Sequence, residues 1–302
     1  MRTSLLSGAA AIALLSAPSA VAQPPRVTNG RLVQQAAESN LPGTVRTIAS
    51  SQTEPVWIGY AAPARPGDHE MCCTGNGYWS GCGLEPDNHT VTDRTVSGGG
   101  TAHLEGDQTL MVLLRVEDKA VQKIRTFSSD CQLDAGSRTI YWLGSVNGAD
   151  SIAFLSSLLN GNASPDAGRS GTVNSASRFS SAALAAIAMH GDASAVPALI
   201  TFARQDPSTK VRGDALFWLA QRAGEQAAAE ITAAIEQDPD TDVKRRAVFA
   251  LSQLPKDEGV PLLIQTARTN KNPVVRKQAM FWLGQSKDPR ALAFFEEILG
   301  KK

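Results

Sequence analysis

The sequence predicts a mainly α-helical protein, in which an α-solenoid of about five helical pairs follows a small β-rich module. A segment of eleven residues recurs at a fixed interval in the second half of the chain. Strand-like segments replace the helical pattern in residues 56–131, and all four cysteines lie within that region. A fixed interval is typical of stacked helical units, because no single unit can bury its apolar face alone.

The first residues have the features of a secretory signal peptide. Arg2 gives a positive start, residues 5–15 are largely apolar, and a small-x-small sequence ends at Ala22. The apolar run is about 11 residues long, whereas a membrane span needs about 20. We therefore expect residues 1–22 to be cleaved after Ala22, which leaves a soluble, secreted or periplasmic protein without a membrane span.

The overall composition is that of an ordinary globular protein without a charge bias. Hydrophobic residues make up 42% and charged residues 19% of the 302 positions. Twenty-nine Lys and Arg residues balance twenty-nine Asp and Glu residues. Because the formal net charge is zero, we expect no nucleic-acid partner and no attraction to anionic membranes.

Residues 23–55 are expected to form a lead-in of low order. They are polar and contain two adjacent prolines near their start. Residues 32–38 are the one helical candidate in this stretch.

The β-rich module is predicted from three strand-like segments. Residues 56–63 are aromatic and β-branched. Residues 109–116 and 120–127 flank the polar turn at 117–119 and therefore predict a hairpin.

Two disulfides are expected in this module, at Cys72, Cys73, Cys82 and Cys131. An even number of cysteines behind a signal peptide favours disulfides. Cys72 and Cys73 are not expected to bond each other, because the ring would strain the peptide between them. One of the two should therefore bond Cys82 and the other Cys131, and the sequence leaves open which.

The alternative for the same region is a metal site. His69, His89 and His103 lie in this module, and imidazole with thiolate suits zinc. However, the chain has no Cys-x2-Cys pair, and the three histidines are irregularly spaced. We therefore expect disulfides, with no metal and no other cofactor.

The recurring segment defines the helical half. VRGDALFWLAQ at residues 211–221 returns as VKRRAVFALSQ at 243–253 and as VRKQAMFWLGQ at 275–285, with the same interval between successive copies. VPALI at residues 196–200 and VPLLI at 260–264 keep the same register, two intervals apart. Two motifs in one register predict an array.

Two further copies extend the array upstream. FSSAALAAIAM at residues 179–189 is degenerate but in phase. Residues 141–159 match residues 281–299 without a gap, which predicts a solenoid over residues 132–302. The extra length falls in residues 160–177, which are rich in Gly, Ser and Asn and read as a loop insertion.

These units resemble HEAT repeats of the short, phycobilisome-lyase-like type. The family pattern is an Asp-Pro turn, then Val-Arg, then a helix that ends near Leu-Gly. The resemblance covers residues 134–302 and says much about fold but little about function. The matching positions are Asp-Pro at 206–207 before Val-Arg at 211–212, Asp-Pro at 238–239 before Val-Lys at 243–244, and Pro273 before Val-Arg at 275–276.

Catalytic motifs are missing from the sequence. It has no Gly-x-Ser-x-Gly elbow, phosphate loop, His-Glu-x-x-His or Gly-x-Gly-x-x-Gly. His69-Glu70 is a lone dipeptide, so it cannot supply the paired His-Glu motifs with which HEAT-type deoxyhypusine hydroxylases hold iron. The related bilin lyases act on cytoplasmic pigment proteins, which a secreted chain would not meet. His190 is expected to be a solvated turn residue.

An aromatic and amide ladder is the candidate binding site. At about 100° per residue, Val211, Ala215, Trp218 and Leu219 share the core face of their helix, and Phe217 lies opposite. Trp142 and Trp282 should likewise be core. In HEAT arrays the second helix lines the concave surface, so the resemblance implies a groove for an extended protein or peptide. The ladder residues are Tyr141, Phe217, Gln221, Phe249, Gln253, Phe281 and Gln285.

The alternative for the ladder is that each ring packs against the next repeat, since most recurring apolar residues in solenoids are structural. Similarly, Arg212, Lys244 and Arg276 are expected to bond neighbouring turns rather than a ligand. The sequence favours a binding or scaffolding protein over an enzyme or metal-binding protein with its site in the Cys/His-rich module. A third possibility is that the β-rich module only caps the solenoid.

Overall fold

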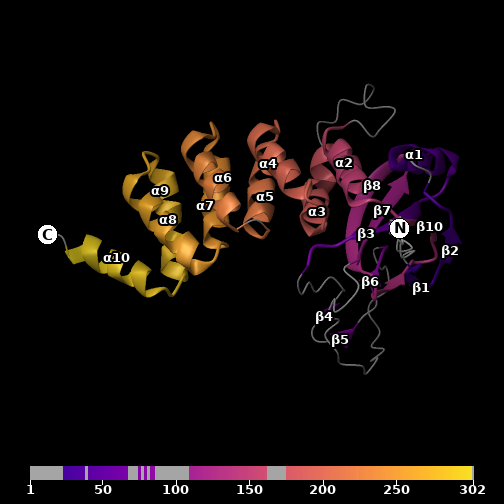
Figure 1. Ribbon diagram of the computed structural model, residues 1–302, viewed down its shortest axis with the longest axis horizontal. Coiled ribbons are helices and arrows are strands. Elements are labelled where there is room, and N and C mark those ends of the chain that lie inside the picture. Colours follow the sequence, from indigo (N-terminus) through magenta and orange to yellow (C-terminus); the bar gives the residue numbers. More distant parts are fainter. Residues whose placement is uncertain are drawn as a thin grey trace, which may run out of the picture.

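A computed structural model describes residues 23–37, 40–66, 74–75, 78–79, 82–85, 109–161, 175–222 and 224–300. A β-rich part forms one end of the molecule, and a row of helices leads from it to the C-terminal end (Figure 1). The proposed signal peptide, Cys72, Cys73, His69, His89, His103 and most of the loop insertion lie outside the described residues.

The main sheet has five strands in the order β2-β10-β3-β7-β8. β10 runs parallel to both β2 and β3, whereas β3, β7 and β8 are antiparallel neighbours. The predicted hairpin is present, and Asp118 and Lys119 at its turn both have positive φ, as a tight turn between twisted strands requires. The strands are β2 (Arg31–Gln34), β3 (Val56–Pro63), β7 (Thr109–Glu117), β8 (Ala120–Ser128) and β10 (Thr139–Ser145).

A smaller sheet packs against one face of the main sheet. Its order is β1-β9-β6, with β1 (Arg26–Thr28), β9 (Gln132–Asp134) and β6 (Cys82–Gly83). Trp57, Met111 and Leu113 from the main sheet share a buried cluster with Cys82 and Leu133 of the smaller one. Two short strands, β4 (Thr74–Gly75) and β5 (Tyr78–Trp79), pair with each other.

The prediction of a low-order lead-in over residues 23–55 is wrong. This stretch contains β1, β2 and the helix α1 (Leu41–Ser51). The helix predicted at residues 32–38 is not present in the described residues 32–37, because Leu32 and Val33 pair with β10 at the edge of the main sheet. The helix starts later, where the Asn40 side chain accepts a hydrogen bond from the Gly43 backbone N–H and caps it.

The predicted first copy of the repeat also differs from the structure. Tyr141 and its neighbours form strand β10 rather than a helix, because β2 and β3 pair with this segment on both sides. Gly144, with φ of +76°, lies near the end of the strand. The solenoid therefore begins with the next helix, at Gly148, and not at residue 132.

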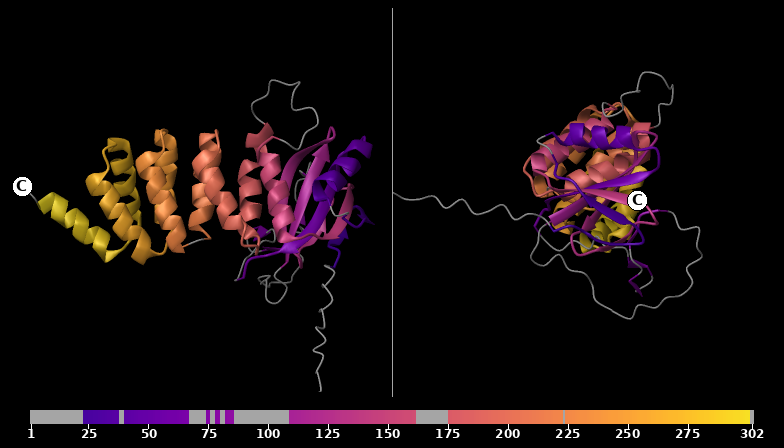
Figure 2. Two further views of the ribbon diagram at one scale, coloured as in Figure 1. Left: turned by 45° about the horizontal axis from the view of Figure 1, so that its top comes forward. Right: turned by 90° about the vertical axis from the view of Figure 1, so that its right-hand side faces the viewer.

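In the described chain, nine helices form the solenoid, and their contacts arrange them in two rows. Figure 2 shows these helices stacked beside the β-rich part. One row is α3, α5, α7 and α9, and the other is α2, α4, α6, α8 and α10. The predicted α-solenoid with a β-containing N-terminal part is thus confirmed. The bounds are α2 (Gly148–Leu159), α3 (Ser175–Met189), α4 (Ala195–Gln205), α5 (Thr209–Ala220), α6 (Gly224–Gln237), α7 (Thr241–Ser252), α8 (Lys256–Thr269), α9 (Pro273–Gln285) and α10 (Pro289–Gly300).

The turns inside the repeats keep the period of the sequence. Asp206, Asp238 and Asn270 each accept a hydrogen bond from the backbone N–H two residues on, at 2.8, 2.8 and 3.0 Å. The residues that donate these N–H groups also cap the helices that follow, α5, α7 and α9. They are Ser208, Asp240 and Asn272.

The basic residues that follow these turns bond the turns, as predicted. Arg212 and Arg276 donate to the carbonyls of Asp206 and Asn270, and the Lys244 ammonium donates to a carbonyl at the end of α6. Arg212 also pairs with Asp238 of the next repeat at 2.8 Å. The hydrogen bond to Asp238 raises the pKa of Arg212. One side chain thus ties two consecutive repeats together.

One hydrophobic core runs from the main sheet into the helices. Ile58, Tyr60 and Val112 point to the face of the sheet opposite the smaller sheet, in the same cluster as Leu155 of α2 and Leu184 of α3. This continuous burial means that the sheet covers the first helices of the solenoid. The β-rich part is therefore packed onto the solenoid rather than separated from it.

Candidate binding surface on helices α5, α7 and α9

The predicted ladder places one phenylalanine on each of three neighbouring helices. Phe217 lies on α5, Phe249 on α7 and Phe281 on α9. The rings of Phe217 and Phe249 stack at 5.7 Å with an interplanar angle of 2°. Because the helices repeat at a constant interval, equivalent positions fall next to each other and their rings meet.

Two tryptophans complete a continuous strip of rings. Trp282 lies 4.9 Å from Phe249 and 5.0 Å from Phe281, measured between ring centroids. Trp218 makes an edge contact with Phe217 at 5.1 Å. Trp218 and Trp282 are half-buried at the border of the core, rather than fully inside it as the helical wheel predicts. We refer to Phe217, Trp218, Phe249, Phe281 and Trp282 as the aromatic strip.

Exposure differs along the aromatic strip. Phe217 and Phe249 are half-buried by their neighbours, whereas Phe281 is 53% exposed. The sequence left two alternatives for these rings, packing between repeats or an open surface. Each alternative holds for part of the aromatic strip. Phe217 and Phe249 contribute to packing, and Phe281 is available to a partner.

A cavity of about 220 Å³ lies beside the strip, between α7, α8 and α9. Its lining includes Gln253, Lys256, Trp282 and Gln285. Within the part of the chain that the structure describes, the buried Nε1–H of Trp282 has no hydrogen-bond acceptor. A buried donor of this kind usually has a partner, but Nε1 is itself covered, so a carbonyl oxygen could reach it only after the side chains around it move apart.

The other ladder residues have different surroundings. Gln253 and Gln285 are exposed on the rim of the cavity, and the Gln253 amide donates to Ser252 Oγ at 3.1 Å. The backbone carbonyl of Gln221 accepts a hydrogen bond from Arg65, which lies just after β3. Tyr141 lies on β10, where its hydroxyl donates to Gln52. Tyr141 therefore does not join the aromatic strip.

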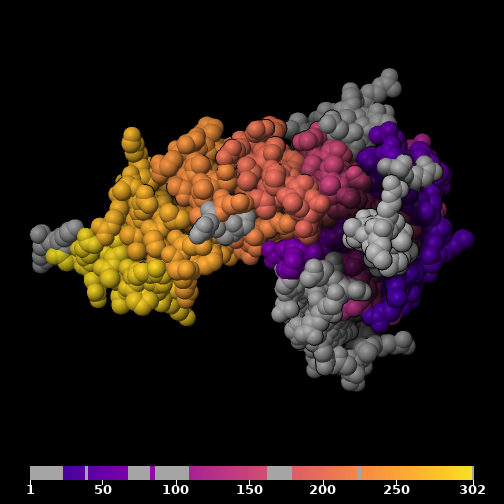
Figure 3. Space-filling view, in the orientation of Figure 1, coloured from indigo at the N-terminus to yellow at the C-terminus, as the bar shows by residue number. Residues whose placement is uncertain are grey.

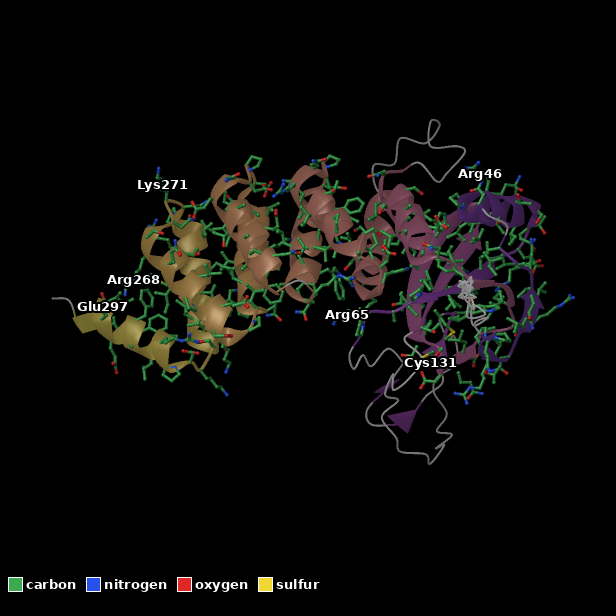
Figure 4. The ribbon with its side chains drawn as sticks, viewed as in Figure 1. Arg46, Arg65, Cys131, Arg268, Lys271 and Glu297 are labelled. Atoms are coloured by element: carbon green, nitrogen blue, oxygen red, sulfur yellow. The ribbon has the colours of Figure 1, made fainter. Side chains whose placement is uncertain are left out.

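The structure describes two of the four cysteines. Cys82 and Cys131 are both buried in the cluster between the two sheets, and Cys131 is disulfide-bonded. Figure 4 labels Cys131 below the main sheet. Cys72, Cys73 and the histidines of the metal alternative are not among the described residues, so the pairing stays a prediction. Among the residues placed, no group of three or more His, Cys, Asp and Glu could hold a metal ion.

A buried polar cluster joins the sheet to the solenoid, and sequence reasoning missed it. His190 is 0% exposed, so the expectation of a solvated turn residue is wrong. Its Nε2 lies 2.7 Å from Ser151 Oγ, which in turn lies 2.8 Å from the Tyr60 hydroxyl. These residues come from β3, α2 and the end of α3, and no local pattern connects positions so far apart.

The hydrogen bonds define the protonation of this cluster. His190 Nδ1 lies 2.6 Å from the Ala186 carbonyl, so Nδ1 carries the proton and Nε2 accepts from Ser151. The Ser151 oxygen then accepts from Tyr60. Burial lowers the pKa of His190 and raises the pKa of Tyr60. The cluster is neutral, internally satisfied and enclosed, which fits a structural joint rather than a catalytic centre.

The comparisons with known proteins identify the repeats. Residues 228–302 match the family model of HEAT repeats. This part of the solenoid is thus built of HEAT repeats, as predicted, and such repeats are typical of protein-interaction or scaffold modules. No curated protein sequence matches the chain. None of the described helices has the length and apolar character needed to cross a membrane.

Two solved structures show similarity to parts of the chain. Human deoxyhypusine hydroxylase in complex with glycerol is 20% identical, with a TM-score of 0.33, over 45% of this chain and 43% of that one. The complex of CpcE and CpcF of phycocyanin lyase from Nostoc sp. PCC7120 is 18% identical, with a TM-score of 0.36, over 51% of this chain and 91% of that one. The chain thus spans less than half the length of the hydroxylase.

Proposed function

We propose that this is an extracytoplasmic binding or scaffolding protein, which holds an extended segment of a protein partner along the aromatic strip. The observation that carries the proposal is the meeting of an exposed ring, Phe281, with the partnerless indole N–H of Trp282 beside a cavity. The strip lies on the row of helices that the HEAT resemblance assigns to the concave surface.

The chemistry of this surface suits a peptide backbone. Rings provide apolar contact area with little loss of side-chain entropy, and Trp and Tyr are common at the centres of interfaces. The exposed amides of Gln253 and Gln285 can both donate to and accept from a peptide group. The covered Trp282 indole would donate to a backbone carbonyl once the side chains around it move apart. An apolar side chain of the peptide would enter the cavity.

The proposed location outside the cytoplasm depends on residues 1–22 and on the cysteines. N-terminal sequencing of the protein from its native host should show a mature chain beginning at Gln23. Mass spectrometry without reduction should show two disulfides and no free thiol. A chain that retains Met1, or four free thiols with bound zinc, would contradict this part of the proposal.

Binding at the aromatic strip is tested with peptides selected from a displayed random library on the immobilised mature protein. Phe281→Ser should weaken the selected peptides about 30-fold, as removal of a central interface ring does. Trp282→Phe removes only the indole N–H and part of the ring, and it should weaken binding about tenfold through the lost hydrogen bond.

Leu299→Ser is the matched control, since Leu299 is also an exposed apolar residue but lies on another helix. It should leave peptide affinity unchanged. If Leu299→Ser weakens binding as much as Phe281→Ser does, or if neither strip variant has an effect, the aromatic strip is not the binding surface.

A further inference from the structure

The charges of the solenoid are divided between its two rows of helices. The helices α5, α7 and α9 carry seven basic residues and two acidic ones. The helices α4, α6 and α8, which alternate with them along the chain, carry three basic and five acidic residues. The excess of positive charge therefore belongs to the row that bears the aromatic strip, although the whole chain has no net charge.

Four of these basic residues lie on the same face as the aromatic strip. Arg245 and Arg246 precede Phe249 by four and three residues, and Lys277 precedes Phe281 by four. At about 100° per residue, such positions lie within about 60° of the ring and about 5 Å before it along the helix axis. The remaining basic residues of this row bond the turns between the helices. We refer to Lys210, Arg245, Arg246 and Lys277 as the basic band.

The two carboxylates of this row do not neutralise the basic band. Asp214 pairs with both Lys210 of its own helix and Arg246 of α7, and Asp242 pairs with Arg245. The side chains of Lys210, Arg246 and Arg245 are still 44, 48 and 50% exposed. Each arginine uses one terminal nitrogen in its ion pair, whereas a guanidinium group carries five N–H donors. The basic band can therefore accept further carboxylates from a partner.

We propose that the partner segment is acidic, with carboxylates that bind the basic band while its apolar side chains contact the aromatic strip. This inference rests on the proposed function, because it concerns the same surface. Successive side chains of an extended segment point to opposite sides. A segment that crosses α5, α7 and α9 between the basic band and the aromatic strip therefore alternates acidic with apolar residues. Ion pairs with carboxylates are also among the strongest hydrogen bonds that arginine makes.

A protein segment suits this surface better than a nucleic acid does. The helices of the solenoid form one continuous body from the β-rich part to the C-terminal end, along which an extended chain can lie (Figure 3). Phe217 and Phe249 are half-buried and stack on each other, so their faces are not available to stack on bases. The zero net charge of the chain also gives no general attraction to a polyanion.

The test uses peptides selected from a displayed random library on the immobilised mature protein. The selected sequences should contain more Asp and Glu than the library does, alternating with apolar residues. Replacement of the carboxylates of one such peptide by amides should weaken its binding about tenfold, as the loss of two or three exposed ion pairs does. Added salt should weaken the acidic peptide in the same way and leave the amide form unchanged, because salt screens exposed charges.

A pair of substitutions removes two charges from the basic band. Arg245→Gln with Lys277→Gln should weaken the acidic peptide about tenfold and leave the amide form unchanged. The matched control, Arg46→Gln with Lys119→Gln, removes the same net charge at the β-rich end of the molecule, where Figure 4 labels Arg46. It should leave the affinity for both peptides unchanged. All four side chains are exposed, so both variants should keep the circular dichroism spectrum of the wild type.

A charge reversal separates this inference from the proposed function. Arg245→Glu with Lys277→Glu should make the protein prefer a peptide with lysines in place of the carboxylates. Selected peptides that depend on Phe281 but show neither acidic enrichment nor a response to the charge variants would overturn this inference and leave the proposed function intact. Failure to select any peptide, or peptides that do not depend on Phe281, would overturn both. Single-stranded oligothymidine that binds the basic band as tightly as the acidic peptide would identify a nucleic-acid surface and also overturn the inference.

Discussion

The first and last described helices of the solenoid differ in how far their apolar side chains are buried. At the N-terminal end, the main sheet covers α2 and α3 with a continuous core, and the Tyr60–Ser151–His190 cluster joins the parts. At the C-terminal end, α10 leaves Leu292 and Leu299 exposed. Each helix of a repeat array is buried by the helices beside it, and among the described residues α10 packs against α8 and α9. The comparison explains why the sheet is part of the solenoid core and why the side chains of α10 are more exposed than those of α2 and α3.

The largest expected effect is at the covered end. Leu155→Ala on α2 should destabilise the protein by about 3 kcal/mol, because the side chain is fully buried between the sheet and the helices. Leu299→Ala on α10 should cost about 0.5 kcal/mol or less, because this side chain is mostly exposed. Urea unfolding followed by circular dichroism measures both.

Because one core spans the sheet and the first helices, Leu155→Ala should lower the stability of both parts together. A variant in which the sheet unfolds while the solenoid keeps its wild-type midpoint would show that the two ends are not built as described. Equal costs for Leu155→Ala and Leu299→Ala would remove the difference between the ends.

A smaller effect is expected at the joint itself. Ser151→Ala removes the hydroxyl between Tyr60 and His190, and it leaves a buried donor and a buried acceptor without partners. The expected cost is about 2 kcal/mol. Ser50→Ala on the exposed side of α1 also removes a serine hydrogen bond, but to a solvated carbonyl, and should stay within about 0.5 kcal/mol. If both serines cost the same, the cluster does not stabilise the joint.

The sequence predicts the repeats well because their contacts are local and periodic. The turns at Asp206 and Asp238, and the ring contact of Phe217 with Phe249, result from the constant interval between repeats. The prediction fails at Tyr141 because a local match to a helix cannot account for partner strands far away in the sequence. Tertiary pairing overrides the local pattern there.

The candidate site is also only partly predictable from the sequence, because some of its contacts join residues that are far apart in the chain. The helical wheel correctly separates Phe217 from the core face, but it treats each helix alone and cannot show that Phe217 and Phe249 bury each other. His190 lies in a turn by sequence, yet Ser151 is 39 positions away, and Tyr60 is a further 91 positions before Ser151. The burial of His190 therefore depends wholly on how the sheet meets the helices. The exposure of Leu299 likewise depends on the packing around α10 and not on its local sequence.

The smallest expected effect is a pH dependence that belongs to the covered end alone. His190 is neutral and buried, and its pKa lies below the ordinary 6.5 because burial disfavours the charged ring. The unfolded chain therefore binds a proton more readily than the folded one as the pH falls below about 6.5. The contribution of His190 to the free energy of unfolding is complete above that pH and is lost as the pH falls toward the folded pKa, by at most about 1.4 kcal/mol per pH unit.

Urea midpoints between pH 7.5 and the acid range should show this slope in the wild type, and His190→Gln should lack it while keeping a hydrogen-bonding side chain. Since none of the described residues on α9 and α10 is a histidine, Leu299→Ala should retain the slope in full. A wild-type slope that survives in His190→Gln would mean that another group titrates, and the joint would then not be the pH-sensitive end of the molecule.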